Sequence, residues 1–244
     1  MMSQHQLMGQ DQAKVAIITG GSQGIGAGLV SGYRREGWSV VANSRAIAPS
    51  QDRQVLAVAG DIADPATADR IVNEALARFG RVDTLINNAG AFISKPFTDY
   101  TAEDYALVVG VNLTGFFRLT QRAIAEMLTA GAGHVVNVTT TIVDHAHSSE
   151  PSVLTSLTKG GVAAATRSLA VEYATRGIRV NAVAPGVIRT PMHSPDSYAA
   201  AAKLAPMERV GQVSDIVDGI LFLESAPFIT GEILHVDGGQ IAGS

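Results

Sequence analysis

The sequence contains no cysteine, which excludes disulfide bonds, thiolate nucleophiles and cysteine-ligated zinc. The sequence also lacks a strong excess of either charge: it has 18 basic and 22 acidic residues, for a formal net charge of −4. So mild a charge does not indicate binding to nucleic acid or to a membrane surface. No apolar run approaches the roughly 18 residues that span a bilayer. These features suit a reducing cytoplasm, and we expect a cytoplasmic location without nucleic-acid or membrane partners.

The N-terminal segment is polar and glutamine-rich, without the basic flank and apolar stretch of a signal peptide. We expect residues 1–13 to form a flexible tail. The remaining residues, 14–244, contain no internal repeat, low-complexity segment or linker, and their number suits one α/β domain. The sequence therefore predicts a single folded domain behind a short tail.

Short apolar runs rich in β-branched residues alternate with helical segments along almost the whole chain. The predicted strands cover residues 14–19, 38–44, 55–59, 84–87, 134–139, 178–184 and 232–236. The predicted helices cover residues 24–36, 65–79, 103–130, most of 151–176, and 213–224. Asp64 is well placed to cap the second helix, with Pro65 as its first residue. This alternation predicts an α/β fold with a doubly wound parallel sheet and helices on both faces.

A glycine-rich segment, Thr19-Gly20-Gly21-Ser22-Gln23-Gly24-Ile25-Gly26, follows the first predicted strand and opens the first predicted helix. Glycines allow a tight turn and a close approach of backbone to a pyrophosphate, while the helix N-terminus supplies N–H donors. A glycine-rich turn alone is a weak signal, but the flanking strand and helix strengthen it. Gly20, Ser22, Gln23, Gly24, Ile25 and Gly26 are therefore predicted to bind a dinucleotide.

The second predicted strand ends in Asn43-Ser44-Arg45, without the acidic residue that would bind an unmodified adenosine ribose. A small hydroxyl followed by a guanidinium suits a 2′-phosphate, which arginine grips through two bonds. The alternative is that Arg45 is an ordinary solvated surface residue. We predict that Ser44 and Arg45 favour NADP(H) over NAD(H).

Several ordered motifs now indicate a family. The glycine-rich segment resembles the TGxxxGxG signature of short-chain dehydrogenase/reductases, and further matches run from Lys14 to Gly239. They are Gly60-Asp61-Ile62, Asn87-Asn88-Ala89-Gly90, Val111-Asn112-Leu113, Asn181-Ala182-Val183-Ala184-Pro185-Gly186, Thr190 and Val236-Asp237-Gly238-Gly239. The resemblance implies a Rossmann-type fold, an NAD(P) cofactor and a small-molecule alcohol/carbonyl substrate. It adds to the predicted cofactor contacts Asp61, Ile62, Asn88, Ala89, Gly90, Lys159, Pro185, Gly186, Ile188 and Thr190.

The resemblance also implies a catalytic set. In the family a tyrosine and a lysine four residues apart share one helix face, and a serine and an asparagine complete the site. Lys159 and Asn112 match the lysine and asparagine, and Thr140 matches the serine. The tyrosine position is occupied by Thr155. An aliphatic hydroxyl has no delocalised anion, so it cannot act as a proton donor tuned toward neutrality as a phenol can.

Two accounts of Thr155 stay open. Either activity is weakened or lost, leaving a dinucleotide-binding sensor or oligomer subunit, or another group donates the proton. The loop before the helix offers His145, His147 and Glu150, which are otherwise solvated loop residues. No metal site is predicted, because a His145–His147 pair lacks further identifiable ligands.

Two further segments bear on substrate and assembly. Met192, His193 and Tyr198 fall where the family forms a substrate lid, and they either contact substrate or pack the lid. One predicted helix has a face of small residues that permits the close approach of another helix. This face is formed by Gly160, Gly161 and residues 163–165. The resemblance implies a homotetramer or a homodimer.

Overall fold

The computed structural model describes residues 13–146 and 150–243. Its sheet has seven parallel strands in the order β3-β2-β1-β4-β5-β6-β7. The strands are β1 Val15–Thr19, β2 Ser39–Ser44, β3 Val55–Ala59, β4 Thr84–Asn87, β5 Gly133–Val138, β6 Ile178–Pro185 and β7 Ile233–Val236. The helices are α1 Gly24–Arg35, α2 Pro65–Phe79, α3 Ala102–Val109, α4 Phe116–Ala130, α5 Val153–Tyr173, α6 Tyr198–Ala201 and α7 Val213–Ser225. The order of the strands reverses at β1 and β4, which confirms the predicted doubly wound sheet.

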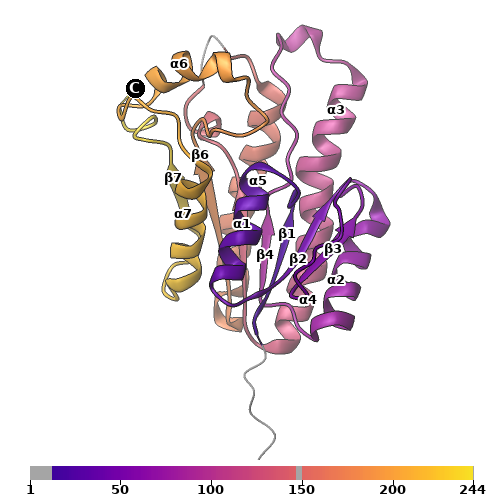
Figure 1. The fold of residues 1–244 in the computed structure, drawn as a ribbon. Coiled ribbons are helices and arrows are strands. Elements are labelled where there is room, and N and C mark those ends of the chain that lie inside the picture. The colour runs from indigo at the N-terminus through magenta and orange to yellow at the C-terminus, as the bar shows by residue number, and fades with distance from the viewer. Residues whose placement is uncertain (1–12, 147–149, 244) are drawn as a thin grey trace, which may run out of the picture.

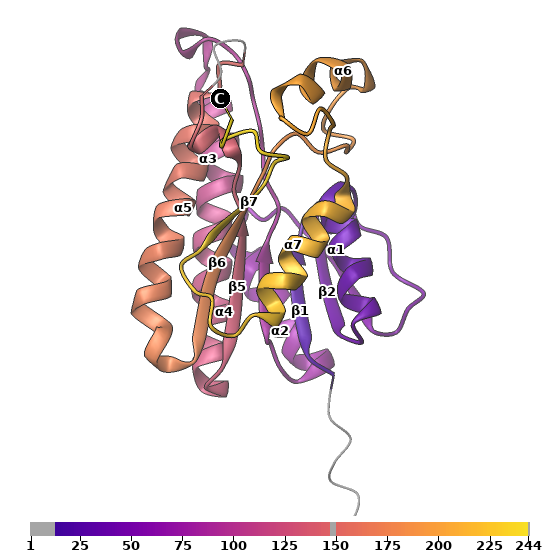
Figure 2. The ribbon, with the colours of Figure 1, turned by 90° about the vertical axis from the view of Figure 1, so that its left-hand side faces the viewer.

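Helices cover both faces of this sheet (Figures 1 and 2). On one face α1 and α7 pack against the strands around Leu29, Val40 and Ile220. On the other face α2, α4 and α5 enclose a second apolar layer around Ile71 and Leu119. All five residues of β1 are buried, because a central parallel strand meets helices on both sides. This burial explains why the strand reads as one continuous apolar run.

Parallel pairing brings the predicted motifs to one edge. Thr19 at the end of β1 lies opposite Asn43 in β2, and Asn87 at the end of β4 lies opposite Asn137 in β5. Val138 pairs in turn with Val183 in β6. The segments that follow these strands therefore emerge side by side, at the edge where open α/β sheets bind ligands.

The predicted helix over residues 103–130 is helical throughout, but its middle is widened by a π-helical turn. The structure ends α3 at Val109 and begins α4 at Phe116, with a π-helical turn over Gly110–Gly115 between them. Within that turn Gly115 comes so close to Ile62 that a Cβ atom would lie 2.9 Å from its side chain. An apolar periodicity does not reveal one inserted residue in a helical turn, and such turns often occur at functional sites. The widened turn places Asn112 beneath the sheet edge described above.

Other local predictions are confirmed. Asp64 caps α2 by accepting a hydrogen bond from the Ala66 backbone N–H at 3.0 Å. The helical region after Pro151 ends at Gly177, whose φ of 76° lies in the left-handed region. The strand bounds agree with the predicted ones to within a residue or two, the usual uncertainty at element ends.

A buried polar cluster lies at the opposite edge of the sheet, where β4, β5 and β6 begin. One carboxylate oxygen of Glu224, at the end of α7, accepts hydrogen bonds from the hydroxyls of Tyr33 and Thr84, each at 3.0 Å. The same oxygen lies 3.0 Å from Nδ1 of His134. This cluster ties two helices to the sheet, far from the ligand-binding edge.

Candidate active site

A cavity of about 660 Å³ opens at the carboxyl ends of the strands. Every residue predicted to bind the cofactor lines it. These residues are Gly20, Ser22, Gln23, Gly24, Ile25, Gly26, Ser44, Arg45, Asp61, Ile62, Asn88, Ala89, Gly90, Lys159, Pro185, Gly186, Ile188 and Thr190. The folding of one chain thus brings together segments as distant as the first strand and the segment after the sixth.

The glycine-rich segment is held against the loop after β4. A Cβ atom on Gly26 would lie 2.1 Å from the carbonyl oxygen of Gly20, so this position accepts no larger residue. The side chain of Asn88 donates a hydrogen bond to the Thr19 carbonyl at 2.8 Å. The Thr19 hydroxyl accepts in turn from the backbone N–H groups of Asn88 and Ala89. These hydrogen bonds hold the glycine-rich segment in place, and the backbone N–H donors at the start of α1 are directed at the cavity.

The end of β2 forms one end of the cavity. The Asn43 side chain donates to the carbonyls of Val58 and Gly60, at 2.9 and 3.1 Å, and so joins β2 to β3. The hydroxyl of Ser44 is buried without a hydrogen-bond partner. Arg45 follows it, exposed and on the cavity wall. An unpartnered buried hydroxyl beside a guanidinium fits an anionic or hydroxylic ligand group.

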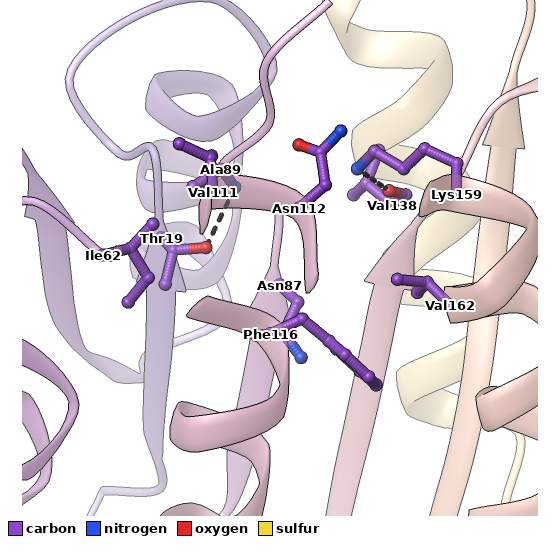
Figure 3. Close-up of a pocket in the computed structure, with 10 residues that line it drawn as sticks. All are labelled: Thr19, Ile62, Asn87, Ala89, Val111, Asn112, Phe116, Val138, Lys159 and Val162. Atoms are coloured by element: carbon purple, nitrogen blue, oxygen red, sulfur yellow. Dashed lines mark hydrogen bonds between the residues drawn. The ribbon is translucent and has the colours of Figure 1, made fainter. Parts of the chain in front are cut away.

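Lys159 lies in the middle of the site. Its Nζ atom donates to the Val138 carbonyl at 2.6 Å, and burial lowers the pKa of its ammonium group from 10.5 to about 8 (Figure 3). The Lys159 Nζ and Asn112 Oδ1 atoms both lie beside Gly90. A Cβ atom added to Gly90 would be 3.3 Å from the first and 3.6 Å from the second, so the ammonium lies close to Asn112. A buried ammonium with one carbonyl partner has donors left for a ligand.

Asn112 does not line the large cavity. Its side chain accepts from the Ala91 backbone N–H at 2.8 Å and donates to the Ala91 carbonyl and the Thr158 hydroxyl. It lines instead a small cavity of about 10 Å³ that also contacts Lys159 (Figure 3). That volume is about what a single water molecule needs. The side chain of Asn112 therefore clamps α5 to the loop after β4, beneath the main cavity.

Thr140 and Thr155 both line the large cavity. Thr140 follows β5, and its hydroxyl accepts a 3.4 Å hydrogen bond from the Ile142 N–H. Thr155 lies one turn before Lys159 on α5, and its buried hydroxyl has no partner. Among the described residues, Ser44 and Thr155 are the two with such orphaned hydroxyls, and both border the same cavity. Buried hydroxyls without partners indicate a site that a polar ligand completes.

The three loop candidates for a proton donor separate in the structure. Glu150 lines the large cavity, whereas His145 is not among its lining residues. His147 lies outside the described residues. Of the lid residues, Met192 and His193 line the cavity. Tyr198 packs against its own segment instead, since its ring centroid lies 4.4 Å from the Arg189 guanidinium and its hydroxyl donates to the Thr190 carbonyl.

Sequence reasoning missed several lining residues. Those it did not single out include Phe92, Leu107, Ile142, Leu204 and Gln240. Most are ordinary apolar residues on loops or helix ends, and no local pattern distinguishes them from core residues.

Within residues 13–146 and 150–243, no helix is long and apolar enough to cross a membrane. The same residues contain no cluster of three or more acidic or histidine side chains that could hold a metal.

The fold and the cavity at its strand ends define a ligand-binding protein of the Rossmann type. Residues 20–240 match the protein family described as enoyl-(acyl carrier protein) reductase. The chain is 34% identical to 3beta-hydroxysteroid dehydrogenase 1 of Eggerthella lenta, over 94% of each protein. The chain therefore belongs to the short-chain dehydrogenase/reductase family.

Solved structures agree with this assignment. The chain superimposes with a TM-score of 0.88 on the structure described as ElxO with NADP bound, at 29% identity over 94% of this chain and 99% of the other. It matches equally well, with a TM-score of 0.88 and 32% identity over the same shares, the 3-ketoacyl-(acyl-carrier-protein) reductase of Brucella melitensis complexed with NADH. One neighbour thus holds NADP and another NADH.

Proposed function

We propose that this protein is an NADP(H)-dependent oxidoreductase for a small alcohol/carbonyl pair, on which it is a slow catalyst. The observation that carries the proposal is that one cavity is lined by the glycine-rich N-terminus of α1, by a buried lysine and by two hydroxyls without partners. The relatives named above, which are oxidoreductases or hold nicotinamide dinucleotides, support an enzyme over a non-catalytic binding protein. A bound nicotinamide would exchange a hydride with the substrate.

The residues of the cavity fit this cofactor. The N–H groups at the start of α1 bind the pyrophosphate, with the Gly20 and Gly26 positions kept free of side chains. Ser44 and Arg45 bind the adenosine ribose and its 2′-phosphate, and Lys159 binds the ribose of the nicotinamide. Thr140 donates a hydrogen bond that orients the substrate oxygen.

Thr155 sets the rate in this proposal. A carbonyl that accepts a hydride becomes an alkoxide and needs a proton. A phenol beside the Lys159 ammonium would supply it, because the positive charge lowers the phenol pKa. The short, aliphatic hydroxyl of Thr155 neither reaches as far nor ionises. We therefore propose that cofactor binding is intact while proton transfer to carbonyl substrates is weak.

Arg45 should decide between the two cofactors. We expect the wild-type protein to bind NADPH more tightly than NADH, and Arg45→Ala to weaken NADPH binding by about 1.5–3 kcal/mol, the worth of a charge-assisted hydrogen bond. NADH binding should change little. Fluorescence titration of both cofactors measures this. Arg176→Ala, which removes an exposed arginine after α5 at the opposite sheet edge, is the control. Equal wild-type affinities for the two cofactors would contradict the prediction.

We propose a homotetramer, supported by apolar side chains left exposed on α5 and near α7. Leu157 and Val171 are 57% and 82% exposed, and Phe222 and Phe228 are 53% and fully exposed. Large apolar side chains that stand in water are the groups that a contact between subunits would cover. Light scattering at micromolar concentration should give four times the chain mass of 25.4 kDa. A sole species of 25.4 kDa would refute both the tetramer and a dimer.

A further inference from the structure

The end of the cavity away from Ser44 has mostly apolar walls. Phe92, Leu107, Ile142, Met192 and Leu204 line it, from the loop after β4, from α3, from the segment after β5 and from the lid. The start of α5, α3 and α6 all lie toward the upper end of the molecule in Figure 1. A substrate that enters here exchanges water for hydrocarbon over most of its surface.

At this apolar end of the cavity, the one aspartate, glutamate, lysine or arginine side chain among the described residues is negatively charged. The charged residues that line the cavity are Arg45, Asp61, Lys159 and Glu150. Arg45 and Asp61 follow β2 and β3 at the opposite end, and the ammonium of Lys159 is bonded to the Val138 carbonyl in the middle. At the apolar end, the described part of the chain therefore offers Glu150 as its one carboxylate and no arginine or lysine.

The backbone that follows Glu150 is held in place at Pro151. The Pro151 carbonyl accepts hydrogen bonds from the Lys95 backbone N–H and the Ser94 hydroxyl, each at 3.0 Å. The ammonium of Lys95 is itself engaged, 2.6 Å from the Asp104 carboxylate. No ion pair to the half-buried Glu150 carboxylate occurs among the described residues. A carboxylate held on an apolar wall without a cation is complementary to a positively charged ligand.

We propose that the substrate carries a cationic nitrogen in an apolar frame, and that Glu150 recognises it. This proposal rests on the proposed function, because the cavity that Glu150 borders is the one assigned there to the cofactor and substrate. An anionic substrate would meet the carboxylate of Glu150 and is disfavoured.

Two kinds of substrate share this chemistry: a carbonyl compound with an ammonium group, and an iminium ion. The second also suits Thr155. When a hydride from reduced nicotinamide adds to an iminium carbon, the C=N π pair becomes the nitrogen lone pair and the cationic charge passes to the oxidised nicotinamide. The product is a neutral amine and no proton is required. An iminium ion can therefore react without the acid that the Thr155 position lacks.

The first test is binding. Isothermal titration calorimetry on protein saturated with NADP⁺ compares benzylamine, benzyl alcohol and phenylacetate, which share a ring and differ in charge. We expect benzylamine to bind at least about tenfold more tightly than the alcohol, with phenylacetate weakest. Glu150→Gln should remove that preference, and Glu36→Gln, on the far end of α1, should keep it. Equal binding of amine and alcohol, or a preference unchanged by Glu150→Gln, overturns the proposal.

A role of Glu150 at the N-terminus of α5 alone would lower the melting temperature of Glu150→Gln and leave the amine preference intact, which also overturns the proposal. Failure of NADP⁺ to bind would instead refute the proposed function.

Turnover then separates the two kinds of substrate. Wild-type reduction of an N-methylated dihydroisoquinolinium, but not of tetralone, supports the iminium. Reduction of phenacylamine in preference to acetophenone, measured in Thr155→Tyr, supports the amino ketone. A wild-type preference for the neutral ketones overturns both.

Discussion

Thr155→Tyr should raise the rate of carbonyl reduction by about 10²–10⁴-fold, the range that a positioned general acid contributes. The new side chain would begin on the wall of the large cavity, one helical turn before Lys159. The buried ammonium of Lys159 would favour the phenolate and so lower the phenol pKa toward the working range. NADPH affinity should change little, because the groups proposed to bind the cofactor are untouched.

The control for this substitution is Thr155→Phe, which places the same ring in the cavity without a hydroxyl. Steady-state turnover of a ketone panel and NADPH titration are compared for the wild type and both variants. The tyrosine variant alone should gain activity. A gain in both variants would mean that filling the cavity, rather than proton donation, limits the wild type. Fast wild-type turnover would show that another group already donates the proton, and Glu150→Gln and His193→Gln would then identify it by a large loss of rate with NADPH binding retained.

The elements and the glycine-rich part of the cavity wall could be predicted because their signals are local, and the family resemblance supplied the other predicted lining residues. The glycine-rich segment, the apolar run of β1 and the cap at Asp64 each depend on a few adjacent residues. Parallel pairing then brings their ends to one edge without further information. This is why all the residues predicted to bind the cofactor line one cavity.

The substrate end could not be predicted in the same way. Phe92, Leu204 and Gln240 reach the cavity from three distant segments, and each belongs to a residue type that is as common in a core or on a surface. The π-helical turn around Asn112 was also hidden, and the partners of Asn112, Ala91 and Thr158, lie far from it in the sequence. Chemistry that depends on the spacing of distant segments leaves no pattern in a single sequence.

The polar cluster at the other edge of the sheet should control stability. We expect Glu224→Ala to lower the free energy of unfolding by several kcal/mol, since each buried donor left without an acceptor costs about 1–3 kcal/mol. The substitution leaves the Tyr33 and Thr84 hydroxyls and the His134 ring without their common acceptor. Such a loss is a large share of the roughly 5–15 kcal/mol that stabilises a typical domain.

Urea unfolding at fixed protein concentration measures the change. Glu224→Gln retains an acceptor oxygen in the same place and should cost less than the alanine variant. Glu36→Ala, at the exposed end of α1, should change stability by no more than about 0.5 kcal/mol. Equal losses in Glu224→Ala and Glu36→Ala would show that the cluster contributes nothing beyond ordinary surface residues.

The same cluster should make the protein sensitive to acid. Nε2 of His134 accepts from Asn181 and Arg179, so Nδ1 carries the hydrogen that is donated to Glu224 and the ring is neutral. Burial lowers the pKa of His134 below its ordinary value of 6.5, and the Arg179 charge lowers it further, against the opposing effect of Glu224.

For Glu224, burial raises the carboxyl pKa, but the hydrogen bonds that it accepts from His134, Thr84 and Tyr33 outweigh burial and lower it. Both groups therefore bind fewer protons in the folded state than in the unfolded chain. Stability is full above about pH 6.5 and is lost progressively as the pH falls through the folded-state pKa of each group. Urea midpoints measured from pH 7 to pH 5 should decline in the wild type and decline less in His134→Asn. Equal slopes in the two proteins would rule out His134 as the titrating group.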